Sequence, residues 1–227
     1  MTAQALTLTD MTPTETNADK SRRFWDRMAR KYAKGKIADQ AGYERSLERT
    51  RDFLATDQDV LEIGCGTGTT ALHHAPFVRH ITGTDISPEM VEIAREKIAE
   101  TGPLNADFIA STAENLPFPT ASFDVAMGHN LYHLVDDVDA ALAEAHRVTK
   151  PGGIFITKTP CLGEMNAFLR NVVMPVMKRF YGVAALQMFT TRDLKAALTR
   201  AGFEIMAVEF HGTKGKDTRP FIVARRG

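Results

Sequence analysis

The stretch DVLEIGCGTG, residues 59–68, joins a short apolar run to three glycines that alternate with other residues. The apolar run has the length and composition of a buried strand. Gly64, Gly66 and Gly68 allow the backbone to turn sharply and to approach a ligand closely. Helix-forming residues follow to about Ala75, and the free N–H groups at the start of such a helix favour an anionic group. The stretch therefore predicts a strand, a ligand-binding loop and a helix, in that order.

Strands and helices continue to alternate after this unit. Further strands are predicted at 80–84, 107–110, 123–128 and 153–158, with helices at 87–100 and 138–148. Ser87 is a natural helix N-cap, and Pro88 suits the first turn. Strands joined by helical crossovers form a parallel sheet that helices cover on both faces. The pattern predicts a doubly wound, Rossmann-like α/β fold.

The C-terminal part should close the sheet with a strand of opposite direction. A helix is predicted at 191–200, followed by strands at 203–210 and 221–224. The loop from Gly212 to Arg219 is too short for a helical crossover, so the last strand should pair antiparallel with its predecessor. We therefore expect a mostly parallel, seven-stranded sheet with an antiparallel last strand.

The chain is expected to be one domain, at 17–227, behind a flexible tail at 1–16. The tail is rich in threonine and lacks the basic start and long apolar stretch of a signal peptide. An N-terminal helical cap is predicted at 17–56, with helices at 17–34 and 43–54. Residues 161–189 interrupt the regular alternation and are expected to form an apolar insertion over one end of the sheet.

Composition excludes several classes of protein. The 227 residues include 28 basic and 28 acidic side chains, so the formal net charge is zero and gives no overall attraction to nucleic acid. Cys65 and Cys161 are far apart and have no metal or redox spacing, which indicates a reducing, cytoplasmic environment without a disulfide scaffold. No apolar run reaches the roughly 20 residues that span a bilayer.

Asp85 follows the second predicted strand, about 20 residues after the glycine loop. In a doubly wound fold this is the place of a carboxylate that binds ribose hydroxyls. The alternative is an acidic residue that serves the N-terminus of the helix after Ser87, and the two roles are compatible.

Five ordered motifs between about residues 20 and 160 resemble those of class I S-adenosylmethionine-dependent methyltransferases. They are VLEIGCGTG (60–68), GTDIS (83–87), AENLPF (113–118), FDV (123–125) and RVTKPGG (147–153). The glycine loop differs from the dinucleotide fingerprint, which would need a glycine where Thr69 stands. Overall the chain is similar to the ubiquinone/menaquinone-biosynthesis methyltransferase-like group.

This resemblance implies S-adenosylmethionine as the cofactor. The implied binding residues are Tyr32, Glu62, Gly64, Cys65, Gly66, Gly68, Asp85, Ile86, Met90, Thr112, Ala113, Glu114 and His129. Asp85 would hold the ribose, Ile86 would pack on the adenine, and Tyr32 would close over the cofactor from the first helix. Thr112 departs from the family, which often has Asp there, and Met90 also fits an ordinary buried helix position.

Methyl transfer requires mainly that the acceptor is positioned and water is removed, so no strong catalytic constellation is expected. The candidates lie in HNLYHL, residues 129–134: His133 as a proton acceptor and Tyr132 as a residue that orients the acceptor. A packed structural role for His133 is the alternative. HNLY lacks the two prolines of the N-P-P-Y motif of DNA and amide methylation, which argues against a nucleic-acid substrate. No metal site is expected from His73, His74 or His146.

The apolar insertion favours a small, apolar or lipid-like methyl acceptor. A dimer contact or a plain core lid would explain the same composition. Residues 17–36 contain eight Lys/Arg against two Asp, so the first helix would suit peripheral contact with an anionic membrane, or simply a solvated face. The functional alternatives are a phospholipid or membrane-lipid methyltransferase and a non-catalytic S-adenosylmethionine-binding regulator. The motifs define neither the acceptor atom nor the oligomeric state.

Overall fold

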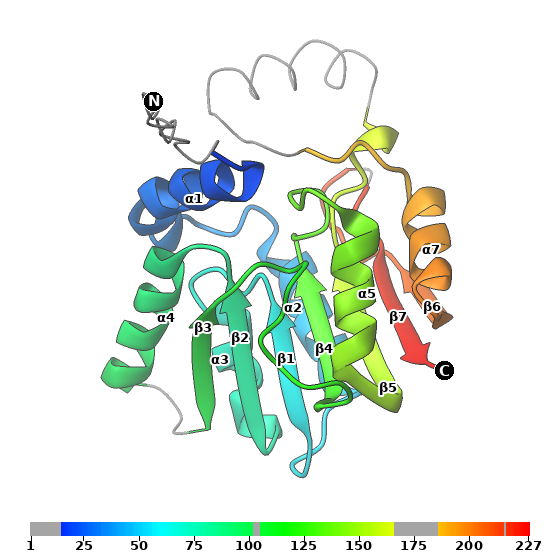
Figure 1. The fold of residues 1–227 in the computed structure, drawn as a ribbon, viewed down its shortest axis with the longest axis horizontal. Helices are drawn as coiled ribbons and strands as arrows, with labels where there is room; N and C mark the ends of the chain where they lie inside the picture. Colours follow the sequence, from blue (N-terminus) through cyan, green and yellow to red (C-terminus); the bar gives the residue numbers. More distant parts are fainter. Residues whose placement is uncertain (1–14, 102–104, 166–185, 216) are drawn as a thin grey trace, which may run out of the picture.

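A computed structural model describes residues 15–101, 105–165, 186–215 and 217–227. These residues form one seven-stranded sheet with the order β3-β2-β1-β4-β5-β7-β6 (Figure 1). The strands are β1 (Asp59–Ile63), β2 (His80–Asp85), β3 (Ala106–Ala110), β4 (Phe123–His129), β5 (Thr149–Lys158), β6 (Phe203–Glu209) and β7 (Phe221–Arg226). β1 to β5 pair in parallel, whereas β7 runs antiparallel to both neighbours. The predicted fold class is confirmed.

The last strand enters the sheet between β5 and β6. Because β7 is paired on both sides, it continues to Arg226, two residues beyond the predicted end. Its residues Phe221 to Ala224 are fully buried. The connection from β6 is too short to cross the sheet, so β7 forms a hairpin with β6, as the sequence predicts.

Helices cover both faces of the sheet (Figure 1). α3 (Thr69–His74), the 3₁₀ turn η1 (Ala75–Phe77) and α4 (Pro88–Thr101) pack on one face, and α5 (Val138–Val148) and α7 (Thr191–Arg200) pack on the other. Alternate residues of β1 serve the two cores, with Val60 in one and Leu61 and Ile63 in the other. Such two-sided burial explains why the strands have continuous apolar runs.

The N-terminal helices α1 (Asn17–Ala33) and α2 (Gln40–Arg51) lie where the sequence predicts helices, with one difference. α2 was expected at 43–54 but covers Gln40–Arg51, so both ends lie three residues earlier. It begins at Gln40 because the Asp39 carboxylate accepts a hydrogen bond from the Gly42 amide and caps the helix. α1 begins with a capping box in which Thr16 and Asp19 bond each other's backbone amides.

The expected tail and insertion fall largely outside the described residues. Residues 1–14 of the tail and 166–185 of the insertion are not described, and η2 (Leu162–Glu164) precedes the latter. Within the described ranges, none of the helices combines the length and the apolar character needed to cross a membrane.

Candidate functional site

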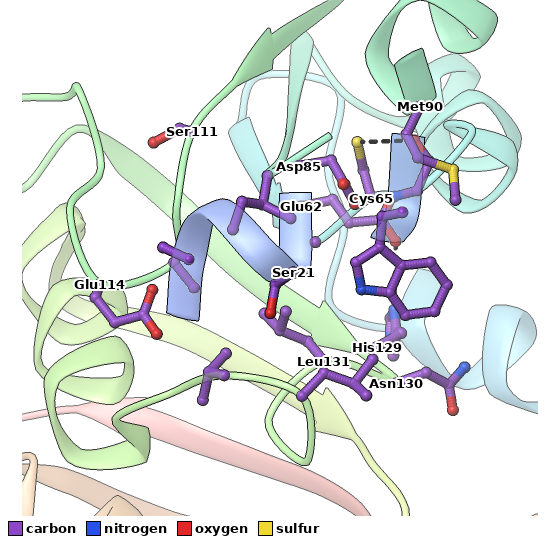
Figure 2. Close-up of a pocket in the computed structure, with 18 of the residues that line it drawn as sticks. Ser21, Glu62, Cys65, Asp85, Met90, Ser111, Glu114, His129, Asn130 and Leu131 are labelled. Atoms are coloured by element: carbon purple, nitrogen blue, oxygen red, sulfur yellow. Dashed lines mark hydrogen bonds and ion pairs between the residues drawn. The ribbon is translucent and has the colours of Figure 1, made fainter. Parts of the chain in front are cut away.

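A first cavity lies at the carboxyl ends of β1, β2 and β4, beneath α1 (Figure 2). Strand order reverses at β1, because β2 lies on one side of it and β4 on the other. Open α/β sheets bind ligands at such a crevice. The predicted site residues that line it are Tyr32, Glu62, Gly64, Cys65, Gly66, Asp85, Ile86, Met90, Ala113, Glu114 and His129. The fold therefore gathers most of the predicted cofactor residues around one space.

The three glycines of the loop are required for different structural reasons. All three have positive φ, at 69°, 54° and 74° for Gly64, Gly66 and Gly68. A Cβ on Gly64 would lie 2.7 Å from a Leu131 methyl group, whereas one on Gly66 would meet only Tyr32, at 3.8 Å. A Cβ on Gly68 would collide with the Phe108 ring at 2.6 Å. Gly66 thus keeps the cavity open, while Gly68, which does not line the cavity, lets the loop pack on the neighbouring strand.

Asp85 ties the end of β2 to the glycine loop. Its carboxylate accepts hydrogen bonds from the Gly66 amide and the Ser87 amide, each at 2.9 Å. Burial raises the pKa of Asp85 to about 6, against the lowering effect of these two bonds. A carboxylate oxygen can accept two hydrogen bonds, so each oxygen keeps one acceptor position for a ligand.

Glu62 and His129 form a buried polar pair beside Asp85. Glu62 is 2% exposed, and its Oε1 lies 3.7 Å from Nδ1 of His129. Burial raises the pKa of the Glu62 carboxyl. Among the described residues, neither Glu62 Oε2 nor either ring nitrogen of His129 has a hydrogen-bond partner. Buried polar atoms are rarely left unpaired, so these atoms indicate a polar ligand.

α1 forms the cover of the first cavity. Trp25 lines the cavity and packs edge-on against Tyr32, with ring centroids 6.2 Å apart. On its other side, Trp25 contacts a small cluster in which Ala29 of α1 meets Met90 of α4. Met90 therefore has both of its expected roles, since it is buried in the helix contact and lines the cavity.

Polar contacts fix α1 in this position. The Asp26 carboxylate accepts hydrogen bonds from the Ser87 hydroxyl at 2.6 Å and the Glu89 amide at 3.3 Å. Arg30 bonds both Glu89 and Glu96 of α4. The sequence analysis missed Asp26 and Trp25 as parts of the site. Their signal was the aromatic and acidic residues on one face of a helix that otherwise carries basic residues.

Three predicted residues lie outside the lining of the first cavity besides Gly68: Thr112, Tyr132 and His133. Tyr132 is fully buried in the core, where its ring meets Phe155 edge-on at 6.1 Å. Burial lowers the pKa of His133 to about 4, and its Nδ1 lies 3.3 Å from the Thr159 hydroxyl. Next to Thr112, Ser111 lines the cavity instead.

A second cavity adjoins the first and extends between α1, α2 and the end of β5. The two cavities share Tyr32, Cys65, Thr70, His129 and Asn130. Asn130 has φ 53° in the left-handed region, which asparagine tolerates better than most residues. Its backbone N–H donates a hydrogen bond to the Lys158 carbonyl. Burial raises the pKa of the Cys65 thiol well above its usual value, so this sulfur stays protonated. Thr70 was not predicted from the sequence, and Asn130 was included only as part of the HNLYHL segment.

No cluster of three or more His, Cys, Asp or Glu side chains suited to a metal ion occurs in the described part of the chain.

Comparison with known proteins agrees with this geometry. A family model described as "Methyltransferase domain" matches residues 60–153. The chain is 28% identical to the ubiquinone/menaquinone biosynthesis C-methyltransferase UbiE of Coxiella burnetii, over 89% of this chain and 90% of that protein. It is 37% identical to the demethylmenaquinone methyltransferase of Listeria monocytogenes, over 54% of this chain and 56% of that protein.

A solved structure supports the same fold. The YcgJ protein of Bacillus subtilis superposes with a TM-score of 0.65 and 29% identity, over 72% of this chain and 70% of that structure. In sequence, YcgJ, an uncharacterized methyltransferase, is 43% identical over 43% of this chain and 38% of its own length. The sequence matches to YcgJ and to the Listeria enzyme thus span less than two thirds of those proteins.

The fold, the glycine-loop cavity and these matches define the chain as a class I S-adenosylmethionine-dependent methyltransferase. Within this class it resembles the UbiE-like group, to which these two relatives belong. The first cavity fits the cofactor, because it offers an open loop at Gly66, a carboxylate at Asp85 and unpaired polar atoms on Glu62 and His129.

Proposed function

We propose that this chain transfers a methyl group from S-adenosylmethionine to a small, lipid-like acceptor with a ring like that of a quinone precursor. The names of the UbiE and demethylmenaquinone methyltransferase relatives support this acceptor class. The observation that carries the proposal is that two cavities meet at Tyr32, Cys65, Thr70, His129 and Asn130. A group transfer between two small molecules needs such a junction.

In this proposal the first cavity holds the cofactor. Asp85 accepts hydrogen bonds from the ribose hydroxyls with its free acceptor positions. Glu62 accepts one from the ammonium group of the methionine portion, which satisfies its unpaired oxygen. Ile86 and Ala113 contact the adenine, and Trp25 and Tyr32 cover the site from α1.

The chain's own contribution to the reaction is orientation and the exclusion of water. The cofactor supplies an electrophilic methyl group on a sulfonium. The electron pair of the acceptor atom forms the new bond to the methyl carbon, and the electrons of the broken carbon–sulfur bond stay on sulfur. Tyr32 lies on the covering helix and lines both cavities, so its ring, 54% exposed, would pack against the two molecules where they meet.

His129 is better placed than His133 to accept the proton that the acceptor loses. His129 lines both cavities, and its ring nitrogens are unpaired among the described residues. His133 lines neither cavity. We therefore assign the proton-accepting role to His129.

The test is transfer of a radiolabelled methyl group from S-adenosylmethionine to an extract of the host, with separation into organic and aqueous fractions. We expect label in an organic-soluble product, and no label with Asp85→Ala as the matched control. Label confined to the aqueous fraction would contradict a lipid-like acceptor. Cofactor binding without any labelled product would favour a non-catalytic regulator.

A further inference from the structure

The second cavity has a strongly basic lining. Its charged residues are the cations Lys31, Lys36, Lys158 and Arg219 and one carboxylate, that of Asp39. Asp39 is fully engaged, because it caps α2 and accepts two hydrogen bonds from Thr213. These bonds lower the pKa of Asp39 to about 2, so it stays ionised, and the Arg219 guanidinium lies 3.9 Å from it and 3.1 Å from Asp217. The cations of the lining that have no carboxylate at ion-pair distance, within the described residues, are therefore Lys31, Lys36 and Lys158. The space therefore favours an anionic ligand.

Lys158 is the buried cation of this cavity. It ends β5 and is 8% exposed. Its ammonium group donates to the Ser46 hydroxyl at 2.8 Å and to the Gly42 carbonyl at 3.3 Å, both on α2. An ammonium has three donors, so one remains. Within the described ranges no carboxylate lies at ion-pair distance from Lys158, and burial lowers the pKa of its ammonium.

A chain of hydrogen bonds behind Lys158 fixes its orientation. Ser46 Oγ lies 3.0 Å from Nδ1 of the buried His211, and Nε2 of His211 lies 3.1 Å from Glu209. Glu209 is in turn bonded by Arg49. The Ser46 hydroxyl also donates to the Gly42 carbonyl at 2.9 Å, and its oxygen accepts the hydrogen bond from Lys158. The groups that contact Lys158 directly are thus neutral, and the charges of Asp39, Asp217 and Arg219 act on it only from beyond ion-pair distance.

A buried cation with no carboxylate in direct contact is costly, and an anion that reaches it is correspondingly favoured. Apolar side chains lie in the same lining, at Met28, Ile37 and Leu47. The cavity thus combines one buried positive charge with an apolar wall, next to the junction with the first cavity.

We propose that the second cavity binds the methyl acceptor and that Lys158 binds an ionised oxygen on an apolar ring of that acceptor. The apolar part of the ring lies against Met28, Ile37 and Leu47. This inference rests on the proposed function, since it assigns the second cavity to the other substrate of the same reaction, and it adds the charge that this substrate carries.

The experiment uses 2-naphthoate and 2-naphthamide, which share one ring system and differ in charge. Each is titrated by calorimetry into the full-length protein saturated with S-adenosylhomocysteine, the demethylated cofactor. We expect the wild type to bind naphthoate about tenfold more tightly, as one charge-assisted hydrogen bond would give. Equal affinities, or no binding of either probe, would overturn the inference.

Lys158→Met and Lys158→Arg are the matched variants. The methionine variant should lose the preference for naphthoate, and the arginine variant should keep most of it, while both bind S-adenosylhomocysteine within about twofold of the wild type. A methionine variant that keeps the preference would contradict the role of Lys158. Loss of S-adenosylhomocysteine binding in this variant alone would place Lys158 in the cofactor site and also overturn the inference.

Ile37→Trp covers the case in which Lys158→Met does not fold. Ile37 is 43% exposed and lines only the second cavity, so a larger ring there should fill the cavity without disturbing the core. We expect naphthoate binding to weaken at least about fivefold, with S-adenosylhomocysteine affinity unchanged. Unchanged naphthoate binding would place the probe elsewhere. Failure of the wild type to bind S-adenosylhomocysteine would instead contradict the proposed function.

Discussion

The two cavities differ in how the chain builds them. The polar groups of the first cavity come from strand ends and the loops that follow them, chiefly between Glu62 and Asp136, and are set by the local turn of the backbone. The second cavity joins segments from Met28 to Arg219, and tertiary contacts such as Lys158 to Ser46 hold it together. The first cavity, which we propose for the cofactor, is therefore encoded locally, whereas the second cavity, which we propose for the acceptor, depends on how distant segments pack.

The largest effect that would test this contrast is expected at Asp85. Asp85→Ala removes the carboxylate that we propose for the ribose hydroxyls, and two charge-assisted hydrogen bonds correspond to roughly 100-fold or more in affinity. Calorimetric titration with S-adenosylhomocysteine measures this loss. The same variant should keep the far-ultraviolet circular dichroism spectrum of the wild type, and an affinity close to the wild-type value would contradict the ribose assignment.

Gly66→Ala and Gly68→Ala compare a glycine that borders the first cavity with one that packs against the neighbouring strand. Both alanines meet the same backbone strain, because both glycines have positive φ. Only Gly68→Ala also drives a methyl group into Phe108, so it should lower the free energy of unfolding by about 1–3 kcal/mol more than Gly66→Ala does. Chemical denaturation measures this difference. Equal destabilisation would mean that Gly68 has no packing role.

The pH dependence of cofactor affinity should follow the buried carboxylates. Burial raises the pKa of Asp85 to about 6 and also raises that of Glu62. Only the ionised forms accept both sets of hydrogen bonds, so affinity for S-adenosylhomocysteine should be constant above this pKa and fall about tenfold per pH unit below it. Titrations between about pH 5 and pH 8 check this, with Asp85→Asn as the control that removes the contribution of Asp85. An unchanged wild-type affinity at the acidic end would contradict it.

The smallest effect is expected at Asp39, in the wall of the second cavity. Asp39→Ala removes the cap of α2 and the bonds to Thr213, so the midpoint of thermal unfolding should fall by a few degrees. S-adenosylhomocysteine affinity should stay within about twofold of the wild type, because Asp39 does not line the first cavity. Asp39→Asn keeps an acceptor and should recover part of the stability. A large loss of cofactor affinity would contradict the claim that the two cavities act independently.

The sequence predicted the sheet well because its strands are short, apolar and separated by clear loop signals. The unit at 59–68 folds as expected, and the short β6–β7 loop led to the correct antiparallel hairpin. Helix α2 was misplaced by three residues because Asp39 was not identified as its cap. The order of β7 between β5 and β6 did not follow from spacing, because it depends on which sheet edge the hairpin meets.

Site residues could be predicted from the sequence where their position at the end of a predicted strand was enough to define their role. Asp85 and Gly66 are of this kind, and the structure places both at the first cavity. Tyr132 and His133 lie next to each other after β4, yet neither lines a cavity, because Tyr132 is buried in the core and His133 lies against Thr159. Lys158 had no local signal, since its environment is created by α2, more than a hundred residues earlier in the chain.

The most direct test of the account is a crystal structure of the protein with S-adenosylhomocysteine. We expect the ribose on Asp85 and the adenine beside Ile86 and Ala113. The sulfur should lie at the junction formed by Tyr32, Cys65 and His129, and the second cavity should stay free for the acceptor. A cofactor that occupies the second cavity, or one that lies away from Asp85, would contradict the division of the site into a cofactor half and an acceptor half.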